Sequence, residues 1–198
     1  MEKSMEVMAK KEKPLGLWNI PNLLSIFRLL AIPFVVFFLF FPGPLASFMA
    51  ALIFSLASLT DLLDGYIARQ QKTETPIGKL LDPMADKLLI TSAMIMLISL
   101  ERIPAWIVVL IVGREIAITG LRGIASVQGI VIAASKWGKA KTVLQSIALI
   151  GLLLHYEYLG IDFHLLGMIL LVIALLITLW SGLDYFLKFY REHQKLPK

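Results

Sequence analysis

The sequence predicts an all-α integral membrane protein with six transmembrane helices in a single domain. Of its 198 residues, 58% are hydrophobic and only 17% are charged, whereas soluble domains carry about a quarter charged residues. The apolar residues gather in six runs, most of them close to the roughly 20 residues that a helix needs to cross a bilayer. Basic residues lie mainly between alternate runs. Together these observations favour a polytopic helical bundle over a soluble fold.

The six runs are separated by short stretches that contain polar residues, glycine or proline. We interpret the first run as a retained span, because no small-residue cleavage site follows it. The break between the first two runs is Pro42-Gly43-Pro44, and the fourth and fifth runs are short enough that we expect them to continue as helix beyond the membrane. The runs cover 23–41, 45–63, 83–100, 103–118, 142–156 and 163–183.

Charge predicts how the bundle is oriented. All but two of the 19 basic residues lie in the segments that would face the cytoplasm if both termini do so, the exceptions being Arg28 and Arg102. Because basic residues favour the cytoplasmic side, we expect cytoplasmic N- and C-termini. The net charge of +5 then indicates attraction to anionic lipid headgroups and not to nucleic acid. A juxtamembrane segment over 1–21, a bundle over 22–187 and a tail over 188–198 complete one membrane-embedded domain, 1–198.

Two segments leave alternatives open. Residues 14–22 are interpreted as a short stretch along the inner surface. Residues 120–135 are apolar enough to resemble half a span, but three glycines and Arg122 favour a connector or a helix extension. If 120–135 crossed the membrane, the orientation of every later run would be inverted.

Four aspartates lie close together at the ends of the second and third runs. On a helix, Asp61 and Asp64 share one face, and Asp82 and Asp86 share another. Asp82 precedes Pro83, which suits the first turn of a helix. Four converging carboxylates at a membrane boundary require cations, and hard oxygen ligands select magnesium, calcium or manganese over zinc. The alternatives are solvated residues that cap helices, with Asp82 as an N-cap, or carboxylates along an ion path.

This stretch resembles the CDP-alcohol phosphotransferase family, whose signature D-x2-D-G-x2-A-R-x8-G-x3-D-x3-D it matches without a departure. The resemblance implies six transmembrane helices, an active site that faces the cytosol, a homodimer and two divalent cations, Mg2+ first and Mn2+ second. It also implies that Asp61, Asp64 and Asp82 are metal ligands. Asp86 would be the general base and share in binding the second metal. The residues that match are Asp61, Asp64, Gly65, Ala68, Arg69, Gly78, Asp82 and Asp86.

The same resemblance indicates where the nucleotide of a CDP-linked lipid binds. Gly65 and Ala68 would let the cytidine ring lie against the helix backbone, although close helix packing is an alternative explanation for small residues. Arg69 would reach a phosphate or the base, and Gly78 would set the turn between the two site helices. Arg28 lies inside an apolar run and needs a partner, for which a site phosphate or an aspartate would serve. The residues assigned to this site are Asn22, Arg28, Asp61, Gly65, Ala68, Arg69 and Gly78.

Basic residues between the fourth and fifth runs indicate the second substrate. Such a cluster suits an acceptor that carries a phosphate, and the alternative is ordinary positive-inside charge. We assign Lys141 to that charge alone. The acceptor-phosphate residues are therefore predicted to be Arg114, Arg122, Lys136 and Lys139.

Three further segments, NIPNLLSIFR, GREIAITGLRG and SKWGKAKT, resemble the family branch that joins CDP-diacylglycerol to sn-glycerol 3-phosphate at the bacterial inner membrane. That branch releases CMP and makes phosphatidylglycerophosphate. Serine, inositol phosphate or another phospholipid as acceptor would keep the family and change the branch. A divalent-cation transporter is a third hypothesis, which the location of all four aspartates on one side of the membrane disfavours.

Overall fold

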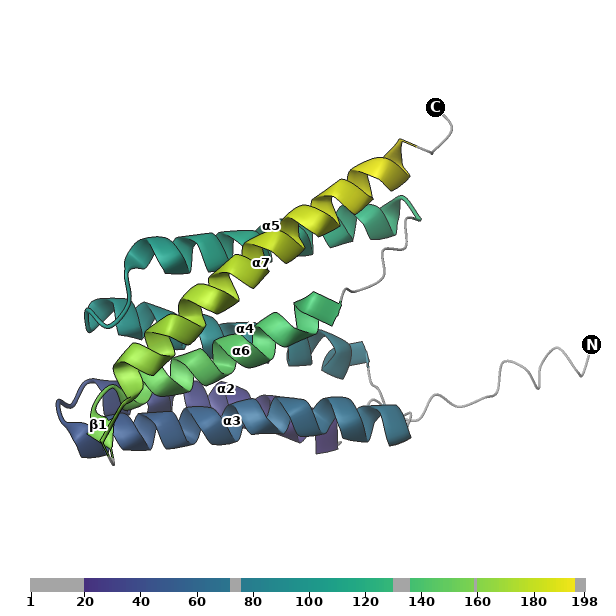
Figure 1. Cartoon of the computed structure of the whole chain (residues 1–198). Helices are drawn as coiled ribbons and strands as arrows, with labels where there is room; N and C mark the ends of the chain where they lie inside the picture. Colours follow the sequence, from purple (N-terminus) through teal and green to yellow (C-terminus); the bar gives the residue numbers. More distant parts are fainter. Residues whose placement is uncertain (1–19, 72–75, 130–135, 159, 195–198) are drawn as a thin grey trace, which may run out of the picture.

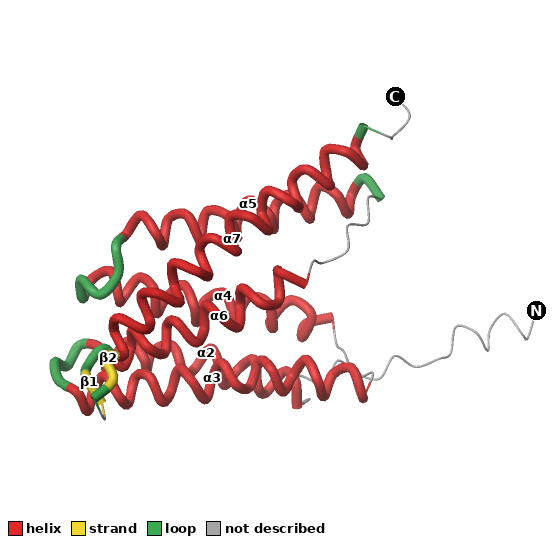
Figure 2. Tube along the Cα trace, in the orientation of Figure 1, coloured by secondary structure: helices red, strands yellow, loops and turns green. Residues whose placement is uncertain are grey.

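The computed structural model describes residues 20–71, 76–129, 136–158 and 160–194. In these ranges the chain forms six helices and a ribbon of two short antiparallel strands (Figures 1 and 2). The strands pair Glu157 with Asp162 and Tyr158 with Ile161. The elements are α2 (Ile20–Leu39), α3 (Pro44–Gln71), α4 (Pro76–Ser99), α5 (Ala105–Val127), α6 (Lys136–Leu154), β1 (Glu157–Tyr158), β2 (Ile161–Asp162) and α7 (Phe163–His193).

Local sequence explains where the helices begin and end. The turn between α2 and α3 contains Gly43, whose φ of +124° is a conformation that glycine adopts readily. The Asp162 side chain caps α7 by accepting a hydrogen bond from the Leu165 amide at 2.9 Å. Arg191 and His193 lie in the last turn of α7, where positive charge complements the helix dipole.

Successive helices run in opposite directions (Figure 1). One end of the bundle, which we call the ribbon end, holds β1 and β2. The starts of α2, α4 and α6 and the ends of α3, α5 and α7 lie together at the other end, the site end. Helix α7 packs most extensively against α6 and also against α5, while α2 packs against both α3 and α4. The aspartates of α3 and α4 therefore lie at the same end of the bundle, next to the start of α2.

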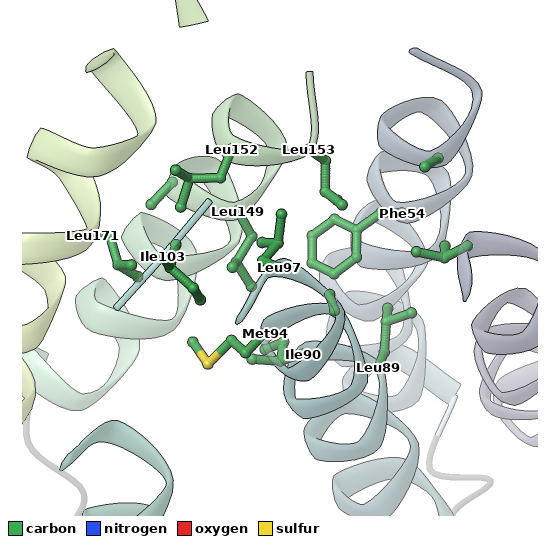
Figure 3. Close-up of a cluster of buried hydrophobic side chains, with 14 of the residues drawn as sticks. Phe54, Leu89, Ile90, Met94, Leu97, Ile103, Leu149, Leu152, Leu153 and Leu171 are labelled. Carbon is green, nitrogen blue, oxygen red and sulfur yellow. The ribbon is translucent and has the colours of Figure 1, made fainter. Parts of the chain in front are cut away.

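The hydrophobic core contains residues of all six helices, and Figure 3 shows part of it. Phe54 of α3 is fully buried beside Leu97 of α4 and Leu149 and Leu153 of α6. Leucine and alanine dominate this core, as expected where helices pack closely without polar partners.

Arg102 closes the ribbon end of the bundle. Its guanidinium is buried, and it donates hydrogen bonds to the Leu153 carbonyl and to the Ser47 hydroxyl, each at 3.0 Å. It thereby ties the start of α3 and the turn before α5 to the last turn of α6, whose carbonyls lack partners within the helix. This structural role accounts for a basic residue at the end where the charge pattern predicts few.

The predicted helices are confirmed, but several extend beyond the apolar runs. Helix α5 continues to Val127, so residues 120–127 are a helix extension. Helix α4 begins at Pro76, seven positions earlier than predicted, because its first turns are too polar for a hydropathy criterion. The N-cap alternative for Asp82 is therefore wrong, since this residue lies inside the helix. Gly78 lies in the first turn of α4 and not in the connection before it. Residues 14–19 and 130–135 lie outside the described part.

Within the described residues, two helices are by themselves long and apolar enough to cross a membrane. They are Asn22–Leu39 and Phe163–His193, with mean hydropathies of 2.2 and 2.5. Shorter apolar stretches occupy Pro44–Thr60 and Ala140–Leu154. Helices α4 and α5 are long, but they contain charged residues.

Close packing of α6 on α7 requires glycine at position 167. A Cβ atom there would lie 2.7 Å from the Leu152 amide nitrogen and 2.9 Å from the Ala148 carbonyl oxygen, both backbone atoms of α6 that cannot rotate away. Because overpacking forces such helices apart, we expect Gly167→Ala to lower the free energy of unfolding by about 1–3 kcal/mol.

The measurement is the thermal unfolding midpoint of the purified protein in detergent. Gly123→Ala on α5 is the matched control, since a Cβ there meets nothing within 4 Å. That change should stabilise the protein by about 0.5–1 kcal/mol, because alanine is the better helix former. Equal midpoints for the two variants would contradict the packing account.

Candidate active site

Helix α3 brings one half of the predicted aspartate set to the site end. Asp61, Asp64, Gly65, Ala68 and Arg69 all lie in its last turns. The spacing of three between the two aspartates places them on one helical face. The side chains of these five residues lie outside the described part of the structure, so their predicted ligand and nucleotide roles stay predictions.

Asp82 on α4 faces the first helix. Its Oδ1 accepts a hydrogen bond from the Ser25 hydroxyl at 3.2 Å and forms an ion pair with Nη2 of Arg28. The Arg28 side chain is completely buried, whereas that of Asp82 is 44% exposed. An aspartate is thus the partner that Arg28 requires inside an apolar helix.

The α2 face that meets α4 is polar only near its start. Asn22, Ser25 and Arg28 follow one another at spacings of three and are buried, and further along the helix Ala31, Val35 and Leu39 continue the buried face. The sequence therefore changes from polar to apolar along one buried helix face. This change confines the polar contacts to the site end.

Asp86 lies one helical turn after Asp82 and borders a different space. It lines a cavity of about 270 Å³ that α4, α5, α6 and α7 enclose together. Arg114 and Arg122 of α5 line the same cavity. The structure therefore brings the predicted base and both predicted phosphate-binding arginines to one cavity.

The cavity has a net positive lining. Its charged side chains are four basic and two acidic residues, namely Lys87, Arg114, Arg122, Lys141, Asp86 and Glu115. Hydrogen bonds from arginine and lysine to a phosphate are among the strong, charge-assisted kind. The space is thus suited to a small anion beside a carboxylate.

Lys141 also lines the cavity, although the sequence analysis predicts no substrate-binding role for it. Its predicted role is positive-inside charge alone, yet its side chain is 6% exposed and forms an ion pair with Oε1 of Glu115. The same oxygen accepts a hydrogen bond from Nη1 of Arg114 at 2.9 Å. Glu115 therefore holds two cations next to each other. In the sequence, Glu115 is the single acidic residue among the five basic residues of 114–141. This isolation is the feature from which a pairing with the basic residues could be predicted.

Two other predicted phosphate-binding residues, Lys136 and Lys139, lie in the first turn of α6, near the cavity-lining Gly138 and Lys141. Their side chains lie outside the described part. Among the residues that the structure does describe, no group of three or more histidine, aspartate or glutamate side chains gathers as a metal site. The side chains of Asp61 and Asp64 lie outside the described part. This observation therefore does not test the predicted four-aspartate cluster.

A larger cavity of about 610 Å³ adjoins the first and shares Asp86, Lys87, Glu115, Thr119 and Thr142 with it. The remaining lining is mostly apolar and comes from α4 and α5, apart from Gln145 of α6. Lys87 crosses between these helices and donates a hydrogen bond to the Thr119 hydroxyl at 2.7 Å. The apolar lining residues include Met84, Leu88, Ile90, Met94, Ile111, Val112 and Ile116.

The family model and the similar proteins all point to one family. A family model described as CDP-alcohol phosphatidyltransferase matches residues 18–180, a range that contains all four aspartates. The chain is 38% identical over 187 residues to a Bacillus subtilis (strain 168) protein named CDP-diacylglycerol–glycerol-3-phosphate 3-phosphatidyltransferase, covering 87% of this chain and 95% of that protein. Proteins of the same name from Rickettsia bellii and Haemophilus influenzae are each 40% identical, over 85% of this chain and 93% and 91% of their own lengths.

Proposed function

Because this chain belongs to the CDP-alcohol phosphatidyltransferase family, we propose that it transfers the phosphatidyl group of CDP-diacylglycerol to sn-glycerol 3-phosphate. The products are phosphatidylglycerophosphate and CMP. The observation that carries the choice of acceptor is the cavity that joins Asp86 to Arg114, Arg122 and Lys141. Relatives similar over most of their length carry the name of this reaction.

In this proposal the acceptor phosphate binds to the basic side chains and its free hydroxyl points to Asp86. Asp86 takes the proton of that hydroxyl while its oxygen attacks the phosphorus that carries the diacylglycerol. The bond from this phosphorus to the oxygen of CMP breaks. Holding the hydroxyl beside a base and the phosphorus supplies much of the rate, because orientation replaces a bimolecular encounter.

The chain's own carboxylates suit divalent cations. Asp82 is 44% exposed and Asp86 borders a cavity, so both present oxygen atoms of the type that Mg2+ and Mn2+ prefer. We propose Asp61, Asp64 and Asp82 as ligands, with Asp86 sharing the second ion. Such ions, when bound, neutralise the pyrophosphate and the charge that develops on it. Ser25 and Arg28 would fix the orientation of the Asp82 carboxylate.

The nucleotide end of the donor is proposed to bind along α3 and the start of α2. Gly65 and Ala68 offer room for the cytidine ring, and Arg69 offers a cation for a phosphate. Asn22 and Arg28 border this region, with Arg28 acting through Asp82. Gly78 lies at the start of α4, within the segment that leads to both α4 aspartates.

We propose that the apolar cavity of about 610 Å³ receives an acyl chain of the lipid. Three features support this role: its lining is mostly apolar, it adjoins the polar cavity, and both contain Asp86. An amphiphile could therefore keep its phosphate near the base and its chain against α4 and α5.

Membrane insertion is supported by what the bundle exposes. Large apolar side chains are exposed along every helix, and on α2 they include Leu23, Phe27, Leu30, Phe34 and Phe37. Contiguous exposed apolar surface is a mark of contact with a membrane or a partner. We propose six spans in one catalytic domain over 1–198, both termini and the active site on the cytoplasmic side, and a bacterial inner membrane. The homodimer implied by the family resemblance is part of the same proposal.

The decisive experiment is CMP release by the purified protein in detergent, with CDP-diacylglycerol, Mg2+ and one acceptor at a time. We expect release with sn-glycerol 3-phosphate and background rates with serine, inositol phosphate or a phospholipid. If CMP were released with another acceptor instead, the proposed role of the aspartates would stand. The proposal that the basic cavity binds the phosphate of glycerol 3-phosphate would then be wrong. Metal flux into sealed vesicles without any CDP-lipid, in protein that releases no CMP, would favour a transporter instead.

A further inference from the structure

Arg114 is held in place by the last helix. Its Nη2 donates a hydrogen bond to the Ser181 hydroxyl of α7 at 2.8 Å, and Ser181 in turn donates to the Thr178 carbonyl at 3.1 Å. The side chain of Arg114 is only 12% exposed. Its Nε is buried and has no hydrogen-bond partner among the described residues. The arginine is therefore oriented by one contact to α7 and one to Glu115.

Gly182 lets Arg114 lie directly against the α7 backbone. A Cβ atom at position 182 would lie 3.0 Å from both Cγ and Nε of Arg114, closer than the roughly 3.5–4.0 Å of a comfortable carbon contact. Glycine inside a helix is unfavourable relative to alanine. The close approach of an arginine supplies a physical reason for it here.

The second cavity arginine also rests on α7. Arg122 lies over the ring of Tyr185 at 5.6 Å from its centroid, a distance at which cation and ring attract each other. Tyr185 is 8% exposed and lies one turn after Ser181. Ser181, Tyr185 and both arginines line the same cavity as Asp86.

From these contacts we infer that Ser181, Gly182 and Tyr185 are positioning residues of the acceptor site. They fix the places of Arg114 and Arg122 and so select an acceptor that carries a phosphate monoester. The inference rests on the proposed function and adds α7 to the site. Its physical basis is that bidentate recognition of a phosphate by arginine depends on geometry as well as charge.

Gly182→Ala tests this role, because it shifts Arg114 without changing any charge. We expect the KM for sn-glycerol 3-phosphate to rise about tenfold, equivalent to about 1.4 kcal/mol. The KM for CDP-diacylglycerol and kcat at saturating acceptor should stay within about twofold, since uniform loss of acceptor binding leaves kcat unchanged. Competitive inhibition by inorganic phosphate should weaken in parallel, which reports on binding without turnover. Gly123→Ala is the matched control and should leave both KM values unchanged.

Ser181→Ala removes the hydrogen bond and adds no volume, so it carries the test if Gly182→Ala fails to fold. A purely structural role for α7 would lower the unfolding midpoint and the amount of active protein without raising the acceptor KM. If both variants showed that pattern and the native protein used glycerol 3-phosphate, the inference about α7 would be wrong and the proposed function would stand. If the native protein used no phosphate-bearing acceptor, the proposed function itself would be wrong, whatever the variants showed.

Discussion

Asp86→Asn should lower the rate of CMP release by about 10²–10⁴-fold, the range expected when a general base is lost. Asparagine keeps the size of the side chain but cannot take a proton from the acceptor hydroxyl. The residue lines the cavity that also contains Arg114, Arg122 and Lys141, in which we propose that the acceptor binds. The effect should fall on kcat and kcat/KM together, since the lost interaction belongs to the transition state.

The rate would be measured at saturating CDP-diacylglycerol, glycerol 3-phosphate and Mg2+. Asp184→Asn provides the matched control. Asp184 pairs with Lys188 across one exposed turn of α7 at 2.7 Å, as its spacing predicts, and such surface pairs contribute little. The control should retain native activity. Native activity in Asp86→Asn itself, in folded protein, would exclude Asp86 as the base.

Asp82→Asn should impair both activity and stability. We expect CMP release to fall at least about a hundredfold, because the change removes a proposed metal ligand at a site where charge must be neutralised. Arg28 is completely buried, so this change would leave its guanidinium beside a neutral amide. We expect the free energy of unfolding to fall by about 1–3 kcal/mol, less than for a fully buried ion pair, because Asp82 is 44% exposed.

A double-mutant cycle with Arg28→Met separates the two effects. The stability losses of Asp82→Asn and Arg28→Met should not add in the double variant, because both remove one interaction. Activity should stay low in all three variants. Thermal unfolding in detergent gives the stability term, and added Mg2+ should stabilise the native protein more than Asp82→Asn. Additive stability losses would show that the ion pair contributes nothing to the fold.

Much of the architecture could be predicted from hydropathy alone. The six apolar runs all became helices, and the break at Pro42-Gly43-Pro44 separates α2 from α3. Helix boundaries were less predictable. Hydropathy reports which residues suit hydrocarbon, whereas a helix continues for as long as its backbone hydrogen bonds do. For this reason α4 begins seven positions before its apolar run and α7 continues to His193.

The active-site residues also include some whose positions the local sequence predicts and others whose positions it does not. The aspartate spacing is a property of one helix at a time, so a helical period is enough to place Asp61 with Asp64 and Asp82 with Asp86. Burial of a lysine is not a local property. Lys141 has a polar, glycine-containing neighbourhood in the sequence, yet α5 and α7 enclose it beside Glu115. The sequence alone therefore does not indicate that Lys141 is buried.

The apolar helical bundle, the spacing of its aspartates and the family to which they belong can all be inferred from the sequence. Hydrophobicity, helical period and motif spacing are all encoded within short stretches of chain. Contacts between residues that are distant in the sequence become visible only in the folded bundle. Arg28 reaches Asp82 across 54 positions, and Arg114 reaches Ser181 across 67. Such pairings depend on how whole helices pack, because the free energy that selects them is distributed over the buried surfaces of the bundle rather than contained in either partner.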